Sequence, residues 1–158
     1  MARWPDELYL ITHAQCDTSG GDANREAGLS QRGKLQAQTL GRWFETHEPS
    51  AVWSSPFRCA RETARIAISA SGVHAPVIVD ERLALGDPSQ MLHDAGSIVD
   101  ALRGCAYPRL AVVTHAAVVV ALSSIIERLP ISAVVSRDRG DCATTIYRRE
   151  NGAIRRIA

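Results

Sequence analysis

Apolar and polar positions follow one another along the chain in a pattern that predicts short buried strands separated by amphipathic helices. Residues 8–12 form an apolar run bounded by turn-forming segments, which is typical of a buried strand. A second strong strand is predicted at residues 110–114. Both strands end in the same tripeptide, Thr-His-Ala, whose histidines are His13 and His115. Because ligands of open α/β sheets bind beyond the carboxyl ends of the strands, we expect both histidines in one pocket.

Helices are predicted between the strands, with turn-forming residues at their ends. Ser30 is a suitable N-cap for the first helix, which Pro49 ends. Ser55-Pro56 and Asp87-Pro88 each combine a capping residue with a proline at the first helical position, and they predict two further helices. The other predicted elements are strands at 51–54 and 77–79, a helix at 116–127, and a hairpin of 142–148 and 153–157 around Asn151-Gly152. This order predicts a single α/β domain over residues 1–158, a three-layer sandwich whose mostly parallel sheet has helices on both faces and a C-terminal hairpin.

The composition is that of an ordinary globular domain. Apolar residues make up 46% of the 158 residues and charged residues 22%, and the net charge is +1, so neither a nucleic-acid partner nor a membrane is indicated. The acidic pair Asp6-Glu7 stands where a secretion signal would be apolar, which favours a cytoplasmic location. The four cysteines are widely spaced without a CxxC pair, which favours reduced thiols over disulfides. We expect a small-molecule partner, and the sequence leaves the oligomeric state open.

Four motifs occur in order along the chain. They are Thr-His-Ala at 12–14, Leu-Ser-Gln-Arg-Gly-Lys-Leu-Gln-Ala at 29–37, Ser-Ser-Pro-Phe-Arg-Cys-Ala-Arg-Glu-Thr-Ala at 54–64 and Thr-His-Ala-Ala at 114–117. They resemble the Arg-His-Gly, Leu-Thr-x-x-Gly-x-x-Gln-Ala, Ser-Ser-Pro-Leu-x-Arg-Ala-x-Gln-Thr-Ala and Ser-His-Gly-Gly motifs of the histidine phosphatase superfamily, also called phosphoglycerate mutase-like. The small size is most similar to the short phosphohistidine-phosphatase branch, and the resemblance covers nearly the whole chain.

The resemblance implies a mechanism. In this family the first histidine attacks phosphorus and becomes a phosphohistidine, which water then hydrolyses. His13 would accordingly be the nucleophile and His115 the second catalytic histidine. Two arginines of the family clamp the phosphoryl oxygens, because a guanidinium fork matches the charge on those oxygens. A carboxylic acid often protonates the leaving group.

This sequence departs from the family at the charged positions. The positions of the two clamp arginines read Thr12 and Cys59, and the position of the acid reads Leu85. Removing one preorganised donor typically costs about 100- to 1000-fold in rate, so we expect an inefficient phosphatase unless another arginine substitutes. The sequence offers Arg58, which is one residue out of register, and Arg25 in the loop after the first strand.

Other groups near the motifs are candidate substrate contacts. The hydroxyls of the two threonines can donate hydrogen bonds into the pocket, and the backbone N–H groups of the two alanines after the histidines can bind an oxyanion. The predicted substrate-binding residues are Thr12, Ala14, Cys59, Arg58, Ala116 and Thr114.

The candidates for a general acid are Glu81 and Asp87, although their positions are also typical of a surface carboxylate and a helix cap, respectively. We expect no metal and no cofactor. A soft-metal site that joins Cys16 and Cys59 to the two histidines is an alternative, because these are zinc-type ligands, but their spacing matches no standard zinc motif.

Three functions follow from this residue set. Two histidines without arginines beside them repel each other's charge, which keeps at least one neutral near pH 7, and a neutral and a protonated imidazole form a general base and a general acid. We therefore predict a repurposed enzyme that carries out acid/base chemistry on a small non-phosphorylated metabolite. One alternative is a weak phosphomonoesterase or phosphohistidine phosphatase that forms a phosphohistidine at His13. Another is a non-catalytic pseudophosphatase with a binding or regulatory role.

Overall fold

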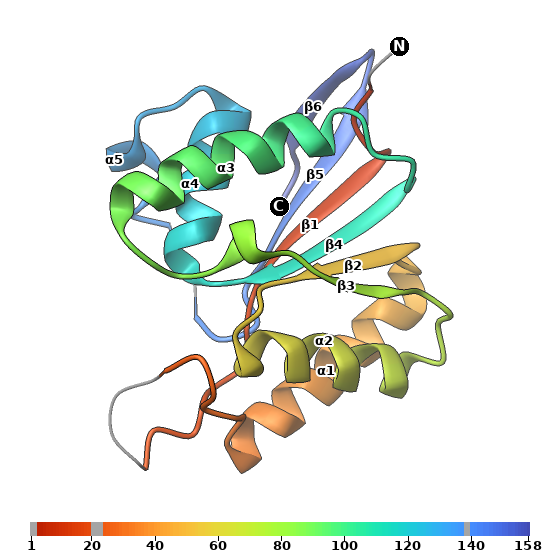
Figure 1. Cartoon of the computed structure of the whole chain (residues 1–158). Coiled ribbons are helices and arrows are strands. Elements are labelled where there is room, and N and C mark those ends of the chain that lie inside the picture. The colour runs from red at the N-terminus through yellow and green to blue at the C-terminus, as the bar shows by residue number, and fades with distance from the viewer. Residues whose placement is uncertain (1–2, 20–23, 138–139) are drawn as a thin grey trace.

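The computed structural model describes residues 3–19, 24–137 and 140–158 (Figure 1). The elements in chain order are β1 (Glu7–Thr12), α1 (Gln31–His47), β2 (Ala51–Ser54), α2 (Arg58–Ser71), β3 (Val77–Val79), the 3-10 helix η1 (Glu81–Leu83), α3 (Pro88–Leu102), β4 (Arg109–Thr114), α4 (Ala116–Glu127), α5 (Ile131–Val134), β5 (Thr144–Glu150) and β6 (Ala153–Arg156). Within these residues the strands form one sheet in the order β3-β2-β4-β1-β5-β6. β3, β2, β4 and β1 are parallel, whereas β5 is antiparallel to β1 and β6 is antiparallel to β5.

Helices cover both faces of the sheet (Figure 1). Successive side chains of a strand point to opposite faces. Tyr9 and Ile11 of β1 accordingly join the core beneath α1 and α2, whereas Leu8 and Leu10 join the core beneath α3 and α4. All four side chains are fully buried. The predicted three-layer α/β sandwich is confirmed, with the hairpin of β5 and β6 at one edge of the sheet. In the described part of the chain, no helix combines the length and the apolar character that crossing a bilayer requires.

Capping residues set the start of two helices as predicted. Ser30 caps α1 and Asp87 caps α3, and each side chain accepts a hydrogen bond from an N–H of the first turn. The helix predicted to begin at Ser55-Pro56 begins later, because Phe57 is the N-cap of α2 and offers no side-chain cap. The hydroxyl of Ser55 instead accepts a hydrogen bond from the N–H of Phe57 and faces a buried histidine.

The C-terminal hairpin forms around the predicted turn. Asn151 and Gly152 have positive φ angles of 51° and 80°, which a two-residue type I′ turn requires. β5 begins at Thr144 and not at Cys142 as predicted, because Cys142 has a φ of 56°, in the left-handed region that a strand excludes. The last strand likewise ends one residue before the predicted boundary at 157.

Gly33 lies in the first turn of α1, against the loop that follows β1. A Cβ at this position would lie 2.1 Å from the carbonyl oxygen of Gln15, a backbone atom that cannot move aside cheaply. Gly33→Ala is therefore expected to lower the free energy of unfolding, measured by urea denaturation, by about 1–3 kcal/mol. Gly96→Ala in α3 is the matched control, because nothing lies within 4 Å of its added Cβ. Its helix propensity predicts a gain of about 0.5–1 kcal/mol. Similar effects of the two substitutions would contradict the close contact at Gly33.

Candidate active site

The two histidines lie side by side because their strands do. β1 and β4 are neighbours in the sheet, and Thr12 pairs with Thr114 at their carboxyl ends. His13 and His115 follow directly, and their rings meet edge to face with centroids 5.1 Å apart. The structure thus brings together the two residues predicted to be catalytic.

His13 is held in one orientation by the backbone. Its Nδ1 lies 2.7 Å from the carbonyl oxygen of Ala14. Because a carbonyl only accepts hydrogen bonds, Nδ1 carries the proton of the neutral ring, and Nε2 keeps its lone pair. His13 also borders a cavity of about 690 Å³. The other lining residues of this cavity are Gln15, Cys16, Asp17, Thr18, Ser19 and Ser30.

His115 is buried, with 4% of its surface exposed. Its Nε2 lies 2.8 Å from the hydroxyl oxygen of Ser55, and the ring of Phe57 meets its ring edge-on at 4.5 Å between centroids. Burial, with a smaller effect of the charge on His13, lowers the pKa of His115 to about 3. His115 is therefore neutral at pH 7, in agreement with the expectation that one member of the pair carries no charge.

The hydroxyls of Thr12 and Thr114 form hydrogen bonds with backbone groups. The prediction that they donate hydrogen bonds into the pocket is therefore wrong. Thr12 donates to the carbonyl of Gly140 at 2.6 Å and accepts from the N–H of Ala143 at 3.0 Å. Thr114 donates to the carbonyl of Leu83 at 2.7 Å. Each hydroxyl thus joins the end of a strand to a neighbouring segment.

The two predicted oxyanion donors differ in their surroundings. The N–H of Ala14 donates to the hydroxyl of Thr63 at 3.0 Å, so the prediction that it is available to a ligand is wrong. Ala116 is the first residue of α4, and among the described residues no acceptor faces its N–H. The start of α4 therefore keeps a donor beside His115.

Cys16 and Cys59 are joined by a disulfide, with their Cα atoms 5.9 Å apart. The prediction of four reduced thiols is therefore wrong for this pair, because the fold brings the loop after β1 against the first turn of α2. Ligand atoms of His13, Cys16 and Cys59 lie within 4.8 Å of one another. His115 is not a member of this group, so the four-ligand set considered as an alternative to the expected absence of metal is reduced to three residues. Cys105 and Cys142 are free, half-buried thiols.

The arginines proposed as substitutes are engaged in ion pairs outside the histidine pair. Nε of Arg58 lies 2.6 Å from the Glu62 carboxylate, and a guanidinium nitrogen of Arg25 lies 3.0 Å from the Glu81 carboxylate. The guanidinium of Arg25 also lies over the ring of Phe57, at 5.2 Å from its centroid. Within the described residues neither arginine forms a hydrogen bond or ring contact with His13 or His115, and Phe57 contacts both Arg25 and His115.

The two candidate acids are placed as a surface carboxylate and a helix cap. The side chain of Glu81 is 74% exposed and pairs with Arg25. The carboxylate of Asp87 accepts a hydrogen bond from the N–H of Gln90 at the start of α3. The structure does not bring either carboxylate into contact with the histidines.

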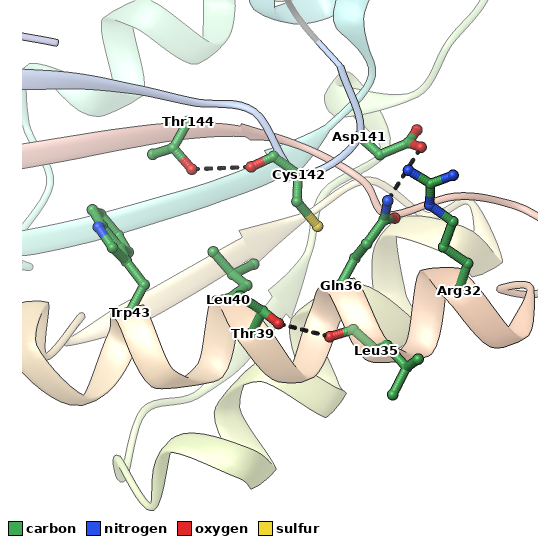
Figure 2. Close-up of a pocket in the computed structure, with 9 residues that line it drawn as sticks. All are labelled: Arg32, Leu35, Gln36, Thr39, Leu40, Trp43, Asp141, Cys142 and Thr144. Carbon is green, nitrogen blue, oxygen red and sulfur yellow. Dashed lines mark hydrogen bonds between the residues drawn. The ribbon is translucent and has the colours of Figure 1, made fainter.

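A second cavity, of about 440 Å³, lies between α1 and the start of β5 (Figure 2). Figure 2 shows Gln36 and Asp141 facing each other across it, and the side-chain nitrogen of Gln36 lies 3.5 Å from Asp141. The amide oxygen of Gln36 also accepts from the N–H of Gln15, so one side chain fixes the loop that borders the first cavity. Burial, with a smaller effect of Asp141, raises the pKa of the Cys142 thiol in this second cavity to about 12.

Sequence reasoning missed three parts of this site. The sequence predicts a helix cap at Ser55, which instead contacts His115, and it does not indicate that Thr63 accepts a hydrogen bond from the N–H of Ala14. The disulfide was not expected. The Ser-Ser-Pro motif was a usable signal for Ser55, because family motifs of this kind mark the site. The other two contacts had no sequence signal, because they join elements about 40 residues or more apart.

Comparisons with known proteins identify proteins that share this fold. The family model described as histidine phosphatase superfamily (branch 1) matches residues 8–84. A mycobacterial glucosyl-3-phosphoglycerate phosphatase, Rv2419c, in complex with VO3 is 19% identical, with 99% of this chain and 98% of that chain covered and a TM-score of 0.77. YhfR of Bacillus stearothermophilus is 21% identical over 95% and 94% of the two chains, with a TM-score of 0.74. The protein histidine phosphatase SixA in complex with tungstate is 14% identical over 96% and 94%, with a TM-score of 0.72. None of the curated proteins matches the sequence significantly.

The fold and the site together define an α/β protein with a histidine at the carboxyl end of each of two central parallel strands. Residues 8–84 match the model of the histidine phosphatase superfamily (branch 1), and nearly the whole chain shares the fold of the solved structures named above.

Proposed function

We propose that the chain is a slow phosphohydrolase that acts on a small phosphorylated substrate through a phosphohistidine at His13. The observation that carries the proposal is the hydrogen bond from Nδ1 of His13 to the carbonyl of Ala14. It fixes the tautomer in which Nε2 has a free lone pair, which is what an attack on phosphorus needs. Structural neighbours that share the fold bear the names of phosphatases, and two were obtained with VO3 or tungstate, which are oxyanions like phosphate.

The reaction has two steps. Nε2 of His13 forms a bond to phosphorus while the bond from phosphorus to the ester oxygen breaks, and water then attacks phosphorus, which releases phosphate and restores the imidazole. The negative charge on the phosphoryl oxygens faces the N–H of Ala116 and the positive end of α4. No carboxylate that the structure describes contacts the histidine pair, so the leaving oxygen takes its proton from water. Aryl phosphates, whose leaving groups need little protonation, are therefore the preferred probes.

The rate is expected to be low because of the charged positions. In the proposed alignment Thr12 and Cys59 occupy the places of the clamp arginines, and the nearby Arg25 and Arg58 are held in ion pairs. Each missing donor typically costs about 100- to 1000-fold in rate. The site thus keeps the nucleophile and lacks most of the charge that would stabilise the transition state.

The test is hydrolysis of p-nitrophenyl phosphate by the wild type and by His13→Asn. The asparagine amide can still donate to the carbonyl of Ala14 but has no nucleophilic nitrogen, so the local hydrogen bond is matched. We expect turnover to fall by about tenfold or more, and mass spectrometry after alkaline quenching should find a phosphoryl group on His13 of the wild type alone. Equal turnover by the wild type and His13→Asn would refute the role of His13 as the nucleophile.

A second candidate function is acid/base chemistry on a non-phosphorylated metabolite. The edge-to-face pair of His13 and His115, with ring centroids 5.1 Å apart, favours it, because imidazole is the side chain that most often serves as a general acid or base. Exchange of carbon-bound hydrogen for deuterium in a set of small metabolites, followed by NMR, tests this function. Exchange that His13→Asn abolishes, in a protein without phosphatase activity, would establish it. The absence of both activities would leave a non-catalytic binding protein.

A further inference from the structure

We propose that Cys16 and Cys59 form a thiol–disulfide exchange site for small thiols, with Cys16 as the sulfur that an incoming thiol attacks. This inference is independent of the phosphoryl chemistry proposed above. Its first basis is the unequal exposure of the two sulfurs. Cys16 borders the cavity of about 690 Å³ that His13 also lines, whereas Cys59 is 3% exposed and does not line that cavity. A small thiol entering the cavity therefore meets Cys16 first.

The surroundings of Cys59 suit a leaving group. Cys59 is the second residue of α2, and the partial positive charge at the start of a helix stabilises the departing thiolate until it takes up a proton. The carbonyl oxygens of Ala27 and Gly28 lie 2.9 and 3.5 Å from its sulfur. Once the sulfur takes a proton, the thiol can donate to the Ala27 carbonyl. The structure thus provides a place for both the bridged and the reduced state of Cys59.

The surroundings of Cys16 suit the return reaction. Nδ1 of His13 lies 3.6 Å from the Cys16 sulfur, and its proton is fixed there by the carbonyl of Ala14. Once the bridge opens, the thiolate of Cys16, which is the form that attacks a disulfide, lies beside this ring at the wall of the cavity, where a small disulfide can reach it. The imidazole that is proposed as nucleophile therefore also touches the exchange site.

The exchange balances without any further reactant. The thiolate of a small thiol forms a bond to the Cys16 sulfur, the bond between the Cys16 and Cys59 sulfurs breaks, and Cys59 leaves with the electron pair and takes up a proton. A second small thiolate then attacks the small-molecule sulfur of the mixed disulfide and releases Cys16. The products are two protein thiols and one oxidised small disulfide. The reverse sequence, with a small disulfide as oxidant, restores the bridge.

The experiment uses full-length protein with reduced and oxidised glutathione as the probes and peptide mapping by mass spectrometry as the readout. Treated with oxidised glutathione, Cys59→Ser should form a mixed disulfide at Cys16 about tenfold or more faster than Cys16→Ser forms one at Cys59. Cys105→Ser is the matched control, and it should lose and reform the bridge as the wild type does. In reduced wild type, iodoacetamide should modify Cys16 before Cys59, which tests the same asymmetry without a substitution.

Three results would overturn the proposal. Equal rates of modification at Cys16 and Cys59 would remove the asymmetry. Failure of the wild type to reform the bridge in a glutathione mixture would remove the exchange. Retention of Zn²⁺ by the reduced wild type against a competing chelator, lost in both single variants and accompanied by failure to reform the bridge, would replace the exchange site with a metal site of His13, Cys16 and Cys59.

Discussion

Replacing Cys59 with arginine is expected to raise kcat/KM for p-nitrophenyl phosphate by about 100-fold or more. The sulfur of Cys59 lies within 4.8 Å of a ring nitrogen of His13, so a side chain from this position reaches the proposed nucleophile. A guanidinium there would place two fixed donors beside the phosphoryl oxygens, where negative charge is concentrated in the transition state. Arg58 does not do this, because it lies one residue before Cys59 in α2 and its guanidinium pairs with the carboxylate of Glu62.

The control for this prediction is Cys59→Ser, which opens the same disulfide and adds no charge. The gain of the arginine variant over the serine variant therefore isolates the guanidinium from the loss of the bridge. Cys59→Lys adds the charge without the planar fork, and it should fall between the two. Thermal unfolding of each variant shows whether the buried position accepts the larger side chain. Folded arginine and serine variants with equal activity would show that charge at position 59 does not limit the reaction.

Acid should destabilise the folded chain through His115. The ordinary histidine pKa of 6.5 applies to the unfolded chain, and burial lowers the pKa of His115 in the folded chain to about 3. Between these values the unfolded state binds a proton that the folded state does not, so stability is complete above pH 6.5 and falls as the pH is lowered toward 3. The slope is about 1.4 kcal/mol per pH unit. From pH 6.5 to 4.5 this one group should remove roughly 2 to 3 kcal/mol of unfolding free energy.

Urea denaturation at pH 6.5 and 4.5 of the wild type and of His115→Gln measures this effect. The glutamine amide can replace the hydrogen bond to Ser55 and does not titrate. Its absolute stability is expected to be lower, because a packed ring is removed, so the comparison is between the changes with pH and not between the values at one pH. Parallel loss of stability in the two proteins would show that His115 is not the group responsible.

The parts of the molecule that the sequence predicted correctly are those set by local pattern. The apolar run before His13 and the run before His115 form neighbouring parallel strands, and this pairing alone puts the two rings together. Asn151-Gly152 forms the hairpin turn because few other dipeptides accept two positive φ angles. These features depend on residues close in sequence or on the rule that strand ends gather at one edge of the sheet.

The parts that the sequence did not predict depend on which way individual side chains turn. Ser55 can cap a helix or face a histidine, and only the position of α4 decides between them. Cys16 and Cys59 are 43 residues apart, and no periodicity reveals that the loop after β1 lies against α2. The motif that includes Ser55 and Cys59 drew attention to both residues but could not say which groups their side chains would contact.

The hydroxyl of Thr12 has a consequence for how this site can change over evolutionary time. It donates to the carbonyl of Gly140 and accepts from the N–H of Ala143, so it fastens the end of β1 to the segment before β5. An arginine at position 12 would leave both backbone groups without these partners, and a lineage could accept it only after a compensating change in that segment. Cys59, in contrast, is held by a disulfide to the side chain of Cys16, and a single substitution at position 59 removes this link. An arginine can therefore enter the site by a single substitution at position 59 in α2, whereas an arginine at position 12 in β1 first needs a change in the segment before β5.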